Sequence, residues 1–165
     1  MNSISLNIWS SYFSTVAEAG ATLTGLLFVA VSINLSRILV TPGLTGRVAE
    51  SLVQLFGVVA IATTYLVPGL HLRTLGVLLL GITSIVWAMQ VYTQARYVAA
   101  RMGNPRHWIL ARIMQTQVSC IPFFVSGVLF LVGSSVAPYW SAVGLMLSLA
   151  AGIASAWVLL IEILR

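Results

Sequence analysis

The feature that most constrains this chain is the stretch of residues 10–39, which is apolar and carries one carboxylate, Glu18, and no other charge before Arg37. About 20 apolar residues in an α-helix cross the roughly 30 Å hydrocarbon core of a bilayer. The stretch therefore predicts a transmembrane helix. Because the backbone must satisfy its own hydrogen bonds in lipid, such a helix favours a helical membrane bundle.

The composition agrees with an integral membrane protein. Hydrophobic residues make up 59% of the 165 positions and charged residues only 7%, whereas about a quarter of the residues of a soluble domain are charged. Turn residues separate the apolar stretches, so we expect an all-α bundle of five transmembrane helices. It forms one domain over residues 1–165, with helices at about residues 10–39, 48–67, 74–99, 108–132 and 139–164.

The arginines predict the orientation of these helices. The chain has no lysine, and seven of its eight arginines fall on one side of the expected arrangement, with only Arg73 on the other. The basic side of a membrane protein faces the cytoplasm, so we expect the N-terminus outside and the C-terminus inside. No basic run suggests nucleic acid, and the lipid bilayer is the expected partner. The seven arginines are Arg37, Arg47, Arg96, Arg101, Arg106, Arg112 and Arg165.

Small and polar residues follow one stripe of the first predicted helix. Steps of four and three residues connect them, which places them on one helical face. In lipid such a face packs on protein or lines water. We consider two interpretations, a pore or solute path and simple close packing. The stripe consists of Ser11, Thr15, Glu18, Thr22, Gly25, Val29, Ser32 and Ser36.

Glu18 is the sharpest candidate within the stripe. A carboxylate in a transmembrane segment is costly unless it is paired, hydrated or protonated. One interpretation is a ring at the outer mouth of a pore, or a cation or proton site. The other is an ion pair with Arg73 or His71, which the five-helix arrangement places on the same side.

A second group of polar residues gathers in the half of the bundle expected to face the cytoplasm. Amides inside a membrane must find partners. They form either an inward-facing vestibule or solute site, or hydrogen bonds that hold helices together. This inner polar cluster comprises Asn34, Glu50, Gln54, Gln90, Gln94, Arg112 and Gln115.

The last predicted helix repeats a small residue every four positions, which lets two helices approach closely in lipid. The spacing is equally compatible with packing inside the bundle and with packing between subunits. The residues are Gly144, Ser148, Gly152 and Ala156.

Few residues suit catalysis or metal binding. His71 and His107 are expected on opposite sides of the membrane, and Cys120 is the one cysteine. A compact His/Cys metal site is therefore not expected, and no motif of a hydrolase or of a phosphate-binding loop occurs. We expect no enzyme activity, no metal and no cofactor.

The segment from Ala19 to Leu35, AGATLTGLLFVAVSINL, is followed by Arg37-Ile38-Leu39 and a Pro-Gly loop. In these features the chain resembles a family of small bacterial membrane proteins, some of whose members are labelled modulators of the FtsH membrane protease. The similarity covers about residues 17–50. It implies location in a bacterial inner membrane and a regulatory role, and it supplies no catalytic residues.

Two functions follow from these observations. The first is a homo-oligomeric channel, or a protein that binds or passes a small solute or cation, with the first helix lining the path. The alternative is a non-catalytic regulator that docks on a membrane protease or on another membrane complex.

Overall fold

The computed structural model describes residues 6–41, 43–99 and 106–164, and over these ranges all secondary structure is helical. The side chains at 6, 7, 97, 99, 106–109, 158–160 and 162–164 are not among those described. Five helices are long and apolar enough to cross a membrane, so the all-α fold is confirmed. The elements are η1 (Leu6–Trp9), α1 (Ser10–Ile33), α2 (Leu35–Val40), α3 (Leu44–Thr64), α4 (Leu72–Ala99), α5 (Arg106–Val132) and α6 (Ala137–Leu164).

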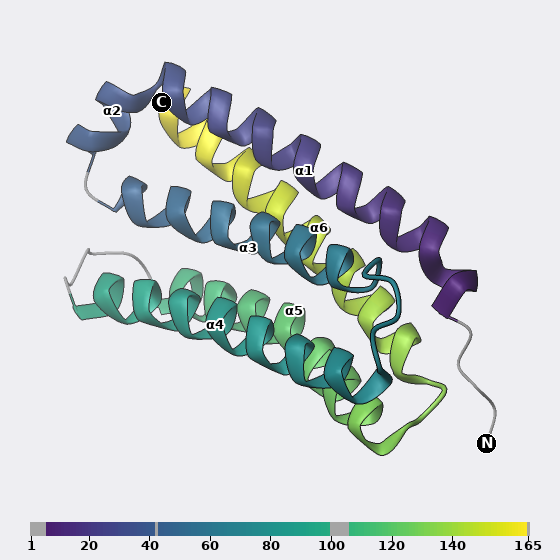
Figure 1. The fold of residues 1–165 in the computed structure, drawn as a ribbon. Helices are drawn as coiled ribbons and strands as arrows, with labels where there is room; N and C mark the ends of the chain where they lie inside the picture. The colour runs from purple at the N-terminus through teal and green to yellow at the C-terminus, as the bar shows by residue number, and fades with distance from the viewer. Residues whose placement is uncertain (1–5, 42, 100–105, 165) are drawn as a thin grey trace.

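Four of the long helices form a bundle, and α1 lies against its outside (Figure 1). Going around the bundle, α3 packs on α4, α4 on α5, α5 on α6 and α6 on α3. Helix α1 packs mainly on α3 and touches α6 only slightly. Because the number of long helices is odd, α1 begins at one end of the bundle and α6 finishes at the other (Figure 1).

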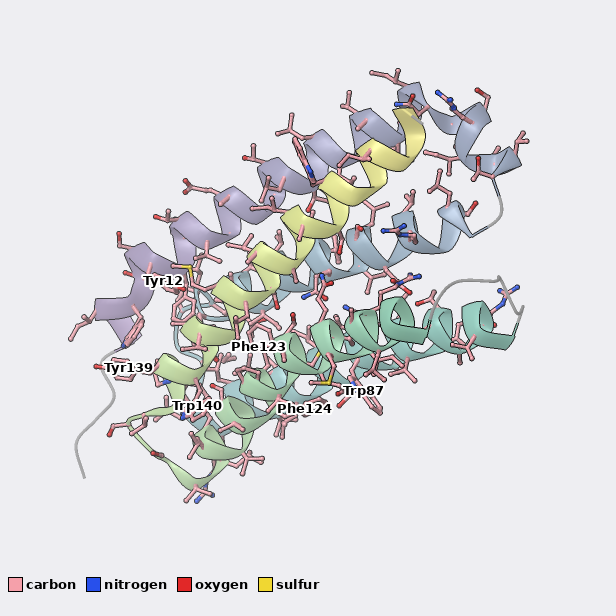
Figure 2. All side chains as sticks on the ribbon, turned by 180° about the vertical axis from the view of Figure 1, so that it is seen from behind. Tyr12, Trp87, Phe123, Phe124, Tyr139 and Trp140 are labelled. Atoms are coloured by element: carbon pink, nitrogen blue, oxygen red, sulfur yellow. The ribbon has the colours of Figure 1, made fainter. Side chains whose placement is uncertain are left out.

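The two ends of the bundle differ in their side chains. The aromatic end contains the rings of Phe13, Tyr65 and Phe130, with Trp9 packed edge-on against Tyr139. Tyr12 and Tyr139 both lie at this end (Figure 2), and each packs edge-on against Trp9. At the opposite end, which we call the arginine end, are Arg37, Arg47, Arg96 and Arg112. Arg101 and Arg165, which also entered the orientation argument, lie outside the described residues, and the side chain of Arg106 is not described.

The first predicted helix is broken, which corrects the expected continuous span of residues 10–39. Helix α1 finishes at Ile33, and Asn34 leaves the helical conformation at φ −106° and ψ 16°. The Asn34 side chain donates a hydrogen bond to the carbonyl of Ala30, 2.9 Å away. An asparagine that bonds its own backbone competes with continuation of the helix. The short helix α2 follows and buries Ile38 beside Leu44.

The other boundaries lie within four residues of the expected ones. Helix α5 contains Pro122 and continues through it to Val132. Large apolar side chains cover the outward faces of α4, α5 and α6, among them Ile85, Val128 and Trp157. Such a surface suits contact with lipid, so the fold is that of a multi-pass membrane protein.

Candidate functional site

The polar stripe of α1 faces away from the bundle. The buried residues of α1 are Phe13, Val16, Ala17, Gly20 and Leu27, which lie on one face at a rotation of about 100° per residue. The stripe lies on the opposite face. Its members are all exposed, namely Ser11, Thr15, Glu18, Thr22, Gly25, Val29 and Ser32 on α1, and Ser36 beyond the break on α2.

Three of the five stripe hydroxyls, those of Thr15, Thr22 and Ser32, bond to their own helix. Thr15 donates to the carbonyl of Ser11 at 2.9 Å, Thr22 to that of Glu18 at 2.8 Å, and Ser32 to that of Phe28 at 2.8 Å. Each of these three hydroxyls therefore has a partner within its own helix, which lowers the free-energy cost of placing it in lipid. The surface of α1 beside Gly25 is open, because a Cβ atom there would meet no atom within 4 Å.

Glu18 is the one ionisable side chain of the stripe. Ser14 donates a hydrogen bond to Glu18 Oε1 at 3.0 Å. Among the residues that the structure describes, Glu18 and Arg73 do not form an ion pair. Helical rise accounts for this, because Glu18 lies about 7.5 Å further into the bundle than Phe13. Arg73 lies in the first turn of α4, at the aromatic end, so the two charges differ in depth.

Most of the inner polar cluster pairs across helices at the arginine end. Arg112 of α5 forms an ion pair with Glu50 of α3. Gln90 of α4 donates to the side-chain oxygen of Gln54 on α3. These two interactions connect α3 to both α4 and α5.

Two further pairs complete this part of the core. Gln94 donates to the hydroxyl of Thr116 at 2.7 Å. Gln115 donates to the carbonyl of Ala151 and to the hydroxyl of Ser155, each at 3.0 Å. Asn34 does not join the cluster, because its amide bonds to α1 itself. These glutamine amides thus bond to groups on neighbouring helices rather than lining an open vestibule.

A third polar group, at the aromatic end, has no counterpart among the predicted site residues. Tyr65 donates to Ser141, Ser141 to Ser126 at 2.6 Å, and Ser126 to the carbonyl of Ala137 at 2.7 Å. All three side chains are buried. The sequence could have predicted that Tyr65 needs a partner, because the hydroxyl of a tyrosine near the end of a transmembrane helix requires one. The identity of the partner depends on how the helices pack.

The small residues of α6 pack inside the bundle. A Cβ atom on Gly152 would lie 2.6 Å from Leu55 Cδ2, and one on Gly144 would lie 2.8 Å from Phe123 Cε1. Ala156 packs against the cluster that contains Leu55. Of the two arrangements that the spacing allowed, these contacts fit packing between helices of one chain.

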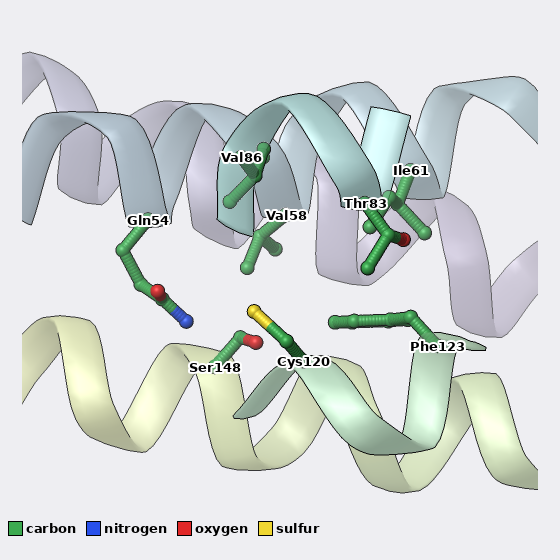
Figure 3. A pocket seen from close by; sticks show the side chains of 9 residues that line it. Gln54, Val58, Ile61, Thr83, Val86, Cys120, Phe123 and Ser148 are labelled. Atoms are coloured by element: carbon green, nitrogen blue, oxygen red, sulfur yellow. The ribbon is translucent and has the colours of Figure 1, made fainter. Parts of the chain in front are cut away.

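The centre of the bundle is largely apolar. Val58, Ile61 and Phe123 lie between the polar groups of the two ends and border a small cavity, which Gln54, Thr83, Cys120 and Ser148 also line (Figure 3). Its space is about that of one water molecule. This cavity is too small for a solute path, so the exposed stripe of α1 is the better candidate site.

The described part of the chain contains no group of three His, Cys, Asp or Glu residues that could hold a metal ion. No protein-family model, no curated protein and no solved structure matches this chain.

Proposed function

We propose that this protein forms homo-oligomers in a bacterial inner membrane and that the stripe of α1 lines a path for small cations between subunits. The observation that supports this is the position of the stripe, directly opposite the face with which α1 packs on its own bundle. A face that carries a carboxylate is poorly suited to lipid. Contact with other copies of the chain, around a hydrated axis, removes it from lipid.

The charge of Glu18 suggests the class of permeant species. If several copies bring α1 to a common axis, their carboxylates form a ring within the membrane. Rings of acidic side chains raise the local concentration of cations and select for them. A path between subunits also agrees with the bundle interior, whose cavity is about the size of one water molecule.

The proposed orientation places the arginine end in the cytoplasm. Arg37, Arg47, Arg96 and Arg112 gather at this end, and Arg73 lies at the other. Such a bias is typical of cytoplasmic ends. Glu18 is then nearer the outer surface.

Cysteine cross-linking in native membranes tests the shared axis. Thr22→Cys places a thiol on the stripe, and Ile85→Cys places one on the lipid-facing side of α4. The depths match, because Gly20 lies against Val58 and Gly57 against Val86. We expect an oxidant to link Thr22→Cys into dimers and not Ile85→Cys.

Native Cys120 is buried, so the unmodified protein serves as the background for this experiment. Monomeric Thr22→Cys together with dimeric Ile85→Cys would show that another face makes the contacts. That result would exclude the shared path along α1.

A second function, regulation of a membrane protease or of another membrane complex, has one observation in its favour. Three stripe hydroxyls, those of Thr15, Thr22 and Ser32, bond to their own backbone, so this part of the face would suit a dry protein contact. A regulator should co-purify with a larger protein and leave liposomes tight to ions. A channel should do the reverse.

A further inference from the structure

The hydroxyl groups in the membrane-spanning part of α1 all donate to α1 itself. This holds for every serine and threonine between residues 14 and 32. Ser14 donates to Glu18 Oε1 at 3.0 Å. The other four donate to the carbonyl of the residue four positions earlier, at 2.7–2.9 Å, and they are Thr15, Thr22, Thr24 and Ser32.

This pattern decides what the stripe offers to another molecule. A serine or threonine hydroxyl carries one hydrogen and two acceptor lone pairs. When the hydrogen is bonded to the helix's own carbonyl, only the lone pairs of the oxygen remain. Thr15 and Thr22 are exposed and lie on either side of Glu18 along the stripe, and a carboxylate also only accepts. This section of the stripe therefore presents hydrogen-bond acceptors and no side-chain donor.

A surface of acceptors without donors fits a cation, because an anion has to be held by donors. Uncharged oxygen atoms replace the water around an alkali-metal cation, as the backbone carbonyls of potassium channels do. Mg²⁺ loses its water reluctantly and requires near-ideal octahedral geometry. Hydroxyl oxygens with a single carboxylate per chain therefore suit a monovalent cation better than a divalent one.

The three side chains lie within a short length of α1. Thr15 and Thr22 are about 10 Å apart along the helix axis, and with Glu18 they fall within a rotation of about 60°. We propose that an alkali-metal cation that has lost part of its hydration shell binds here, held by oxygen atoms of Thr15, Glu18 and Thr22 from several copies of the chain. This inference rests on the proposed function, because it requires the stripes of several subunits at one axis.

Ion flux in proteoliposomes tests the role of the hydroxyl oxygens. Thr22→Val keeps the shape and removes the oxygen, so the ratio of K⁺ to Na⁺ permeability should change several-fold. Thr22→Ser keeps the oxygen and should retain the original ratio. Thr24→Val is the matched control, because Thr24 makes the same kind of backbone hydrogen bond but does not belong to the stripe, and its ratio should stay the same. Thr15→Val should change the ratio as Thr22→Val does.

The outcomes separate this inference from the path on which it rests. Thr15 and Thr22 are both exposed, so the valine variants should fold. An unchanged ratio in both variants, with K⁺ flux intact, would overturn the inference and leave the shared path standing. Passage of Mg²⁺ as readily as K⁺ through the unmodified protein would also overturn it. Absence of both K⁺ and Na⁺ flux from the unmodified protein would contradict the path itself, and the inference with it.

Discussion

Phe13 of α1 stacks on Tyr65, the residue that caps the end of α3, with ring centroids 3.8 Å apart and ring planes 9° apart. Tyr12, the neighbour of Phe13, donates a hydrogen bond to the carbonyl of Ala142 on α6 at 3.1 Å. These contacts fix the rotation of α1 about its own axis. Because Glu18 lies on the opposite face, the stack at the aromatic end is what directs the carboxylate away from the bundle.

Replacing Phe13 with alanine should detach α1 from the bundle at the aromatic end. The ring is 1% exposed, and loss of such a ring costs about 3 kcal/mol of unfolding free energy. Denaturation by SDS in mixed micelles measures this change. Phe28→Ala is the control, because Phe28 is 64% exposed on the same helix and should cost much less. Equal losses in the two variants would contradict the anchoring role.

The ion pair of Glu50 with Arg112 should be more important to stability than any other charge in the described structure. Its side chains are 16% and 20% exposed, so either substitution alone, Glu50→Gln or Arg112→Gln, removes this pair from a largely buried site and should cost about 3 kcal/mol. The double variant should recover part of that loss. Arg96→Gln, at an exposed position, should change little. Additive losses in the double variant would argue against a direct pair.

Leucine substitutions at glycines should separate folding from assembly. Gly152→Leu forces a side chain into Leu55 and should prevent folding, which loss of detergent-resistant monomer would report. Gly25→Leu meets open space, so the monomer should fold while native mass spectrometry in nanodiscs shows weaker oligomers. A Gly25→Leu protein that assembles like the unmodified one would place the subunit contact elsewhere.

The proposed orientation predicts the location of reporter domains. Fusions after Arg106 and after Arg165 should both report the cytoplasm, because an odd number of spans places the C-terminus on the arginine side. A fusion after Pro68, in the turn between α3 and α4, should report the outside. A periplasmic signal from either of the first two fusions would overturn the orientation.

The sequence predicted the helices well because the thickness of a bilayer dictates their length and their apolar character. It missed the break at Asn34, where one side-chain hydrogen bond to Ala30 competes with helix continuation. The amino-acid composition of the segment does not reveal this competition between a side-chain hydrogen bond and continuation of the helix.

The hydrogen-bond partners of the polar side chains could not be predicted from the sequence for a different reason. Gln54 and Gln90 were both expected to find partners inside the membrane, but their pairing depends on the packing of α3 on α4. The same holds for the stripe of α1. Periodicity shows that one face is polar, whereas the opposite face, through Phe13 and Gly20, decides where that polar face points.

The central claim, that Glu18 lies on a cation path between subunits, is tested most directly by ion flux in proteoliposomes. Glu18→Gln keeps the size and removes the charge, so cation flux or cation preference over anions should fall while the oligomer persists. Glu18→Asp keeps the charge and should retain most of the preference. Cation flux and selectivity that are the same in the unmodified protein and in Glu18→Gln would contradict the claim.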